Sequence, residues 1–303
     1  LLRSRDPVEA YGFIEREQAN HSVALMARLL RVSRSGYYAW RRRPASKRDA
    51  ANAALTKVIQ AIFEDSRRTY GARRVHAELL DEFEVRVARH RVARLMRLQG
   101  LQGVHRRKGR RRRGQLHERH QDHVSGQFTK DAPDRVWVAD VTQHRTGEGW
   151  LYLSVVLDVF QRKAVGWAMD DVLNTELVLN AFQMAQQVRR PDPGLIHHSD
   201  QGSPYGSLRF GRHLRASGVV GSMGRSGTPA DNAVAESFFA TLQTELLDRD
   251  DWPTRDALRT AIFEFIEVFY NRRRRHSHLG HLSPVEFERR WHEQQAQAQV
   301  TSP

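Results

Sequence analysis

From Val136 onward the chain changes from helical to β-rich patterning, and this change most limits the folds open to it. Three runs rich in Val, Leu, Trp and Tyr, at 136–142, 151–159 and 164–168, are separated by short turns. Such runs joined by tight turns predict an antiparallel meander. After it we expect a helix over 175–188, a strand over 194–198, a helix over 207–216, a strand at 219–220 and a helix from about 231. The order predicts a mixed α/β sheet flanked by helices.

Three acidic residues occupy unusual places in this half of the chain. Asp140 lies within the first strand, Asp200 just past a later strand, and Glu236 in the first turns of a helix, off its apolar stripe. Ligands of open α/β sheets bind at the C-terminal ends of strands. A buried unpaired acid is costly, and carboxylate oxygens suit Mg²⁺ or Mn²⁺. A salt bridge for Asp140, a turn cap for Asp200 and a surface position for Glu236 remain open alternatives.

The first part of the chain carries the basic charge. Residues 1–130 hold 30 Lys and Arg against 13 Asp and Glu, whereas residues 131–303 hold 19 against 22. With a net charge of +14 and a pI near 10.8, the asymmetry predicts a nucleic-acid-binding front attached to a domain with another task. The densest basic run, residues 105–113, has no apolar periodicity and is expected to be a linker that contacts phosphates or only tethers.

Apolar residues at helical spacing predict two successive helix-turn-helix-like units in this front. Val23, Met26, Ala27 and Leu30 mark one helical face, which breaks at 31–33 before a second short helix. Further stripes begin at Leu55, Ala72 and Val92, and a basic helical bundle that binds no DNA is the alternative. We expect DNA contacts from Arg89, Arg91, Arg94, Arg97, Arg106, Arg107, Lys108, Arg110, Arg111, Arg112, Arg113, Gln243, Arg272, Arg273, Arg274 and Arg275.

Several blocks of the sequence resemble the bacterial insertion-sequence transposases of the orfB type, which are related to retroviral integrases. The core blocks are 137–142 (Trp-Val-Ala-Asp-Val-Thr), 149–153, 197–205 and 231–239; the front blocks are 66–71 and 91–96, and the closing block is 270–280 with Ser283-Pro284. The 35 residues between Asp200 and Glu236 match the family's D,D-35-E spacing. The resemblance implies an RNase H-like integrase core in which Asp140, Asp200 and Glu236 are catalytic and bind two Mg²⁺ or Mn²⁺ ions.

The function implied is a DNA transposase, a polynucleotidyl transferase that nicks insertion-sequence ends and joins the 3′-hydroxyl to target DNA by two-metal-ion catalysis. The implied partners are double-stranded DNA (terminal inverted repeats and target), further copies of the chain on DNA, and an upstream orfA-type partner or frameshift fusion. The alternative is a DNA-binding regulator or an inactive remnant, since Gln243 stands where the family usually has Lys or Arg. A host nuclease of the same fold is disfavoured by the two helix-turn-helix-like units.

The expected domains are an N-terminal helix-turn-helix-like segment (1–46), a second such domain (47–103), a basic linker (104–132), an integrase core (133–291) and a disordered tail (292–303). The chain has no cysteine, which excludes disulfides, Cys-ligated metals and a thiol nucleophile. No apolar stretch reaches the roughly 18–20 residues of a membrane span, so we expect a cytoplasmic, nucleoid-associated protein and no membrane partner.

Some polar residues fit other roles. One of His197 and His198 could orient a carboxylate or touch DNA, although strand alternation is expected to bury at least one. The histidines at 276, 278 and 281 lack the partners and spacing of a zinc site, and DNA contact is the favoured role. Asp158, a fourth strand acid, is expected to be structural.

Overall fold

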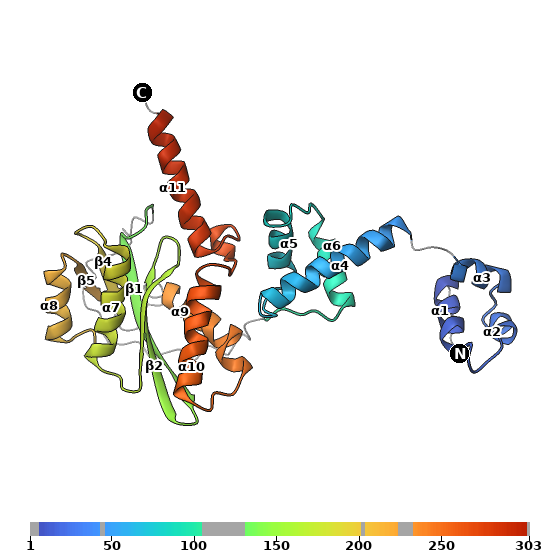
Figure 1. Cartoon of the computed structure of the whole chain (residues 1–303), viewed down its shortest axis with the longest axis horizontal. Helices are drawn as coiled ribbons and strands as arrows, with labels where there is room; N and C mark the ends of the chain where they lie inside the picture. The colour runs from blue at the N-terminus through green and yellow to red at the C-terminus, as the bar shows by residue number, and fades with distance from the viewer. Residues whose placement is uncertain (1–5, 43–45, 105–130, 201–203, 224–232, 302–303) are drawn as a thin grey trace, which may run out of the picture. The chain divides into compact units, whose positions relative to one another are not determined.

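The computed structural model describes residues 6–42, 46–104, 131–200, 204–223 and 233–301 (Figure 1). The chain forms two compact units, Leu1–Val58 and Ile59–Pro303. The expected basic run 105–113 and its DNA contacts from Arg106 to Arg113 lie outside the described residues. Within the described part, no helix is both long enough and apolar enough to cross a membrane.

The first unit is a small helical cluster. Helices α1 (Pro7–Glu17), α2 (Val23–Leu29) and α3 (Arg34–Arg42) enclose the buried side chains of Ile14, Met26, Ala27 and Tyr37. The Ser22 hydroxyl caps α2 by accepting a hydrogen bond from Leu25 N (3.3 Å), as N-cap serines do. The two helices predicted on either side of the break at 31–33 are therefore present, whereas α1 was not predicted.

Helix α4 (Lys47–Asp65) leads into the second unit, where α5 (Ala72–Asp81) and α6 (Arg89–Leu98) pack together. Their apolar stripes follow the predicted spacing, because Ile59, Val75, Leu79 and Val92 are all fully buried. Arginines occupy the remaining faces of α6. Arg89 and Arg97 are exposed, and Arg91 and Arg94 are half-buried.

A five-stranded mixed sheet follows, with strands in the order β3-β2-β1-β4-β5. Strands β1 (Val136–Thr146), β2 (Gly149–Asp158) and β3 (Ala164–Asp170) form the predicted antiparallel meander. Strands β4 (Ile196–Ser199) and β5 (Val220–Met223) lie parallel to β1. Parallel neighbours need crossover connections, and the chain supplies them as helices. The expected RNase H-like mixed sheet is confirmed.

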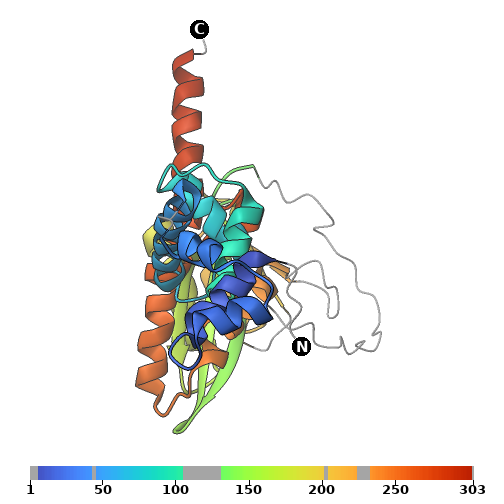
Figure 2. The ribbon, with the colours of Figure 1, turned by 90° about the vertical axis from the view of Figure 1, so that its right-hand side faces the viewer.

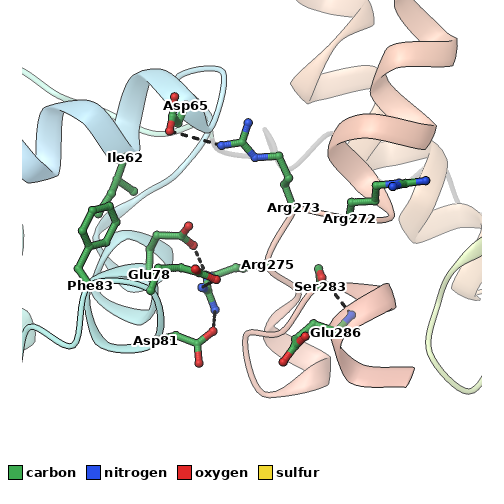
Figure 3. Close-up of a pocket in the computed structure, with 11 residues that line it drawn as sticks. Ile62, Asp65, Glu78, Asp81, Phe83, Arg272, Arg273, Arg275, Ser283 and Glu286 are labelled. Carbon is green, nitrogen blue, oxygen red and sulfur yellow. Dashed lines mark hydrogen bonds and ion pairs between the residues drawn. The ribbon is translucent and has the colours of Figure 1, made fainter. Parts of the chain in front are cut away.

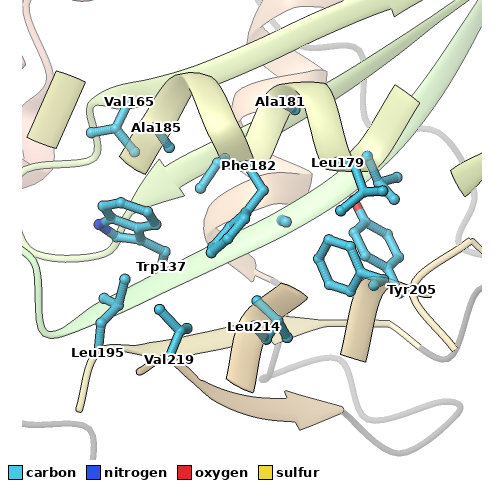
Figure 4. Close-up of a cluster of buried hydrophobic side chains, with 14 residues drawn as sticks. Trp137, Val165, Leu179, Ala181, Phe182, Ala185, Leu195, Tyr205, Leu214 and Val219 are labelled. Carbon is cyan, nitrogen blue, oxygen red and sulfur yellow. The ribbon is translucent and has the colours of Figure 1, made fainter. Parts of the chain in front are cut away.

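Helices cover the two faces of this sheet (Figures 1 and 2). On one face, α7 (Thr175–Arg189) and α8 (Leu208–Ala216) bury an apolar cluster that includes Trp137, Ala139 and Phe182 (Figure 4). On the other, α9 (Ala233–Glu245) packs on β1 and β2, and α10 (Arg255–Phe263) packs on β2. Because successive strand residues point to opposite faces, the neighbours of Ala139 in β1 point toward the α9 layer.

The C-terminal part holds three short elements and a long helix. A 3₁₀ turn (η1, Leu247–Arg249) precedes α10, a π-helical turn (η2, Glu264–Tyr270) follows it, and a second 3₁₀ turn (η3, Ser277–Leu279) precedes α11 (Pro284–Thr301). Helix α11 extends beyond the sheet (Figure 2). The structure thus differs from the expected disordered tail, since residues 292–301 are helical. Ion pairs of Arg289 with Glu286 and Glu293 on successive turns support this helix.

Candidate active site

Two of the three predicted acids meet where β4 ends beside β1. The parallel register pairs Ala139 with Ser199, so the next residues, Asp140 and Asp200, are neighbours. Both line a pocket of about 180 Å³ together with Thr142 and Tyr152. Asp140 Oδ1 accepts a hydrogen bond from Val141 N (2.8 Å). The sheet register thus brings two carboxylates, 60 residues apart in sequence, to one opening.

Glu236 lies on the helix that covers this same face. It sits in the first turn of α9 and is exposed, whereas Ala235 and Phe238 are buried against the sheet. Glu236 is not among the described residues that line the pocket. Within the described ranges, no group of three or more His, Asp and Glu side chains is close enough to hold a metal ion. The structure therefore unites Asp140 with Asp200 and places Glu236 in the adjacent layer.

Tyr205 is a pocket residue to which sequence reasoning gave no role. Its ring is buried against Phe210, with 5.6 Å between ring centroids, and it lines the opening beside Asp140 and Asp200. Burial raises the pKa of Tyr205, and the negative charges of the two carboxylates raise it further. The tyrosine therefore stays neutral, with its hydroxyl buried. Its place five residues after Asp200 in a recognised block was the available signal.

A second polar group follows the same strand face. His144 lies four residues after Asp140, so strand alternation places both on the α9 side. Burial lowers the pKa of His144, and nearby Asp248 opposes that shift. Gln243 Nε2 donates a hydrogen bond to Asp248 Oδ1, so its amide is engaged within the protein. The period-two pattern from Asp140 could have identified His144.

The two histidines before Asp200 are not part of the pocket lining. His197 is fully buried, with its ring 5.2 Å from the centroid of Phe182 and 5.3 Å from that of Phe210. Burial lowers the pKa of His197 to about 4. His198 is also buried, and its Nδ1 lies 3.1 Å from Ser222 Oγ. Strand alternation led us to expect at least one of them in the sheet core, and His197 packs there as a neutral ring.

Asp158 has a structural role, as expected from the sequence. Its carboxylate accepts hydrogen bonds from Asp134 N (2.6 Å) and Phe160 N (2.8 Å), and the side chain is fully buried. Burial raises the pKa of Asp158 to about 7. It tightens the turns at the start of β1 and the end of β2, away from the pocket that holds Asp140.

The closing arginines divide into two groups, and Figure 3 shows three of them, Arg272, Arg273 and Arg275. Arg272 and Arg273 are exposed, and Arg273 pairs with Asp65 (3.4 Å) at the surface. Arg275 is buried and pairs with Glu78 and with Asp81 (3.0 Å), and Arg274 is buried and pairs with Glu245 (2.7 Å). This corrects the expectation that Arg274 and Arg275 contact DNA, because their guanidinium groups already bind carboxylates inside the protein.

Within the described residues, His276, His278 and His281 do not belong to a group of three or more side chains that could hold a metal ion. His276 is buried with its ring perpendicular to that of Tyr270, 4.8 Å between centroids. Burial and the charge of Arg274 lower the pKa of His276 well below the usual value. His278 is exposed, and burial lowers the pKa of the half-buried His281.

Comparisons with known proteins agree with this architecture. The family model described as "HTH-like domain" matches residues 50–109, and two family models described as "Integrase core domain" match residues 130–229 and 217–284. The insertion element IS600 uncharacterized 31 kDa protein of Shigella sonnei is 39% identical over 89% of this chain and 100% of its own length. The transposase InsF for insertion sequence IS3A of Escherichia coli (strain K12) is 37% identical over 92% of this chain and 98% of its own.

Among solved structures, the HTLV-2 integrase catalytic core domain in complex with magnesium covers 52% of this chain and 99% of its own, at 17% identity and a TM-score of 0.40. The two curated relatives, matched almost end to end, carry the family assignment.

Proposed function

Because the chain belongs to the family of insertion-sequence transposases that includes the InsF proteins, we propose that it nicks the ends of an insertion sequence and joins the 3′-hydroxyl to target DNA. The observation that carries the proposal is the pairing of Asp140 with Asp200 in one pocket of an integrase-core sheet. Glu236, on the helix over the same sheet face, completes the proposed triad.

The donor set fits divalent metal ions. Asp140 and Asp200 present hard oxygen ligands side by side in one small pocket, the ligand type that Mg²⁺ and Mn²⁺ prefer. Asp140, Asp200 and Glu236 would hold two Mg²⁺ or Mn²⁺ ions. When bound, the ions would lower the pKa of the attacking water or hydroxyl and neutralise the leaving oxygen of the phosphodiester.

The protein's own groups would bind and orient the DNA around that pocket. Thr142 lines it and can donate a hydrogen bond to a phosphate oxygen. Arg89 and Arg97 are exposed on α6, within the match to the HTH-like domain, where they can contact phosphates or guanine edges. The partners are double-stranded DNA at the terminal inverted repeats and the target, a second copy of the chain on DNA, and an orfA-type upstream protein.

The test is metal-dependent nicking of labelled element ends by the full chain. Asp140→Asn, Asp200→Asn and Glu236→Gln should each reduce cleavage in Mg²⁺ to background while binding of end DNA and the melting temperature stay close to wild type. Asp192→Asn, an exposed acid of the same domain, is the matched control and should cleave normally. Cleavage at the wild-type rate by any one of the three variants would remove that residue from the triad.

A further inference from the structure

Glu245, at the last turn of α9, is buried and bound by arginines from two other parts of the chain. Arg274 donates through Nε to Oε2 and through Nη2 to Oε1, both at 2.7 Å, in the two-pronged geometry that guanidinium and carboxylate favour. Arg74, on α5, donates through Nη1 to Oε1 at 3.1 Å. We call these three residues the clasp. It joins the catalytic layer to the region that matches the HTH-like domain.

The clasp is stiffened by tyrosines on both sides. The Arg74 guanidinium lies over the Tyr70 ring, 5.5 Å from its centroid, and Arg274 lies over Tyr270 at 5.8 Å. The Tyr70 hydroxyl accepts a hydrogen bond from Arg275 N (2.8 Å) and donates one to the Arg273 carbonyl (3.1 Å). These hydrogen bonds hold the start of α5 against the segment that carries Arg274. The backbone of Arg74 is therefore held in place where its side chain contacts Glu245.

Glu245 and Glu236 lie on opposite sides of one helix. The two residues are nine positions apart, which at about 100° per residue gives a half turn beyond two full turns, and they lie about 13 Å apart along the axis. Between them, Phe238 and Leu242 are buried, and Phe238 packs edge-on against Tyr270 with 4.8 Å between ring centroids. The clasp adds directional, charged hydrogen bonds at the end of α9, which act on the rotation of the helix about its own axis.

Small rotations would matter at Glu236. A carboxylate at the end of a helical side chain lies about 5–6 Å from the axis, so a rotation of about 20° moves it about 2 Å. Misplacement of a catalytic group by about 1 Å can lower a rate roughly 10²-fold. Glu236 is exposed in the first turn of α9, so the rotation of the whole helix decides where its carboxylate lies.

The charge balance keeps the clasp closed. Although burial favours the protonated acid, Arg274 and then Arg74 hold the pKa of Glu245 below its ordinary value. Glu245 is therefore ionised while it faces two guanidinium groups. Removing a partner from such a buried pair is strongly destabilising. Substitution of Glu245 or Arg274 would therefore change the stability of the whole domain and would not isolate the effect on the position of Glu236. Arg74 is the more exposed member and the better site for a test.

We propose that Glu245 is a positioning residue that fixes the place of Glu236, and that Arg74 couples this placement to the HTH-like domain. The inference rests on the proposed function, since it concerns the same catalytic acid. It predicts that binding of DNA by the HTH-like domain makes the α9 end of the active site more protected, because Arg74 links that domain to Glu245.

The experiment compares full-length Arg74→Met with Arg73→Met, a neighbouring exposed arginine outside the clasp. Both variants should bind end DNA with dissociation constants within about twofold of each other, because each loses one positive charge at the same helix end. At saturating DNA, Arg74→Met should cleave at least tenfold more slowly than Arg73→Met, and Arg74→Lys, which keeps the charge, should recover most of that loss.

Hydrogen exchange of the α9 amides (233–245) gives a readout without chemistry. End DNA should slow their exchange in wild type and in Arg73→Met, and not in Arg74→Met. Equal cleavage at saturating DNA by the two Met variants, or equal slowing of α9 exchange, overturns the inference. If the wild-type chain does not cleave, the proposed function fails, and the exchange comparison still decides whether the clasp links the two regions. If Arg74→Met does not fold, the same comparisons are made between Arg74→Gln and Arg73→Gln, which also remove the charge and are expected to differ in the same way.

Discussion

Replacing His197 with Leu should change the acid stability of the catalytic domain. His197 lies in the aromatic cluster between β4 and α7, and neither ring nitrogen has a hydrogen-bond partner within the described residues. Its folded-state pKa is lowered to about 4 from 6.5 because burial penalises the charged ring. The unfolded chain therefore binds a proton below pH 6.5, whereas the folded protein does not until about pH 4. Stability is lost as the pH falls through this window.

The size of the loss follows from the two pKa values. Between pH 7 and pH 5, protonation of this one group in the unfolded chain lowers the free energy of unfolding by about 2 kcal/mol. For a domain of this size, that corresponds to a fall in melting temperature of about 4–8 °C. Leucine has nearly the volume of histidine and no titrating group. In His197→Leu we therefore expect this part of the acid loss to disappear, with little change at pH 7.

The assay is urea unfolding at pH 7 and pH 5, followed by tryptophan fluorescence, to which the buried Trp137 of the same cluster contributes. The wild type should lose about 2 kcal/mol more than His197→Leu between the two pH values. His90→Gln, which removes an exposed histidine from α6, controls for the loss of a histidine as such and should behave like wild type. Equal acid losses in wild type and His197→Leu would refute the buried, neutral state of this ring.

Gln243→Lys alone should raise the cleavage rate little, because Asp248, which accepts a hydrogen bond from Gln243, would pair with the new ammonium group. The double variant Gln243→Lys with Asp248→Asn should leave the ammonium group available to a DNA phosphate and raise the cleavage rate up to about tenfold. This increase should be larger at low salt. Arg97→Gln should reduce the log–log salt slope of DNA binding by about 0.9, whereas Arg275→Gln should leave the slope unchanged and lower the melting temperature. The fragment 131–303 lacks the α5 carboxylates that pair with Arg275, and it should melt below the same domain in the full chain, as measured by calorimetry.

The sequence was sufficient where the determining interactions are local. Strand alternation, turn residues and helical spacing set the order of β1, β2, β3 and α7, and their predicted bounds differ from the structure by only a few residues. The placement of Asp140 in a strand and of Asp200 at a strand end also follows from local pattern. The later part of α11 was the clearest local failure, because residues 292–301 were expected to be disordered although ion pairs such as Arg289 with Glu293 have helical spacing.

What the tertiary structure alone decided is which charged groups face inward. A run of four arginines at 272–275 looks uniform in sequence, yet two are exposed and two are buried. Arg274 is buried because Glu245, 29 residues away, neutralises it, and Arg275 because Glu78, 197 residues away, does so. A charge can leave water only when its partner is already in place, and that partner is brought by packing of distant elements. Sequence pattern determines the elements, and their packing determines which arginines remain exposed at the surface.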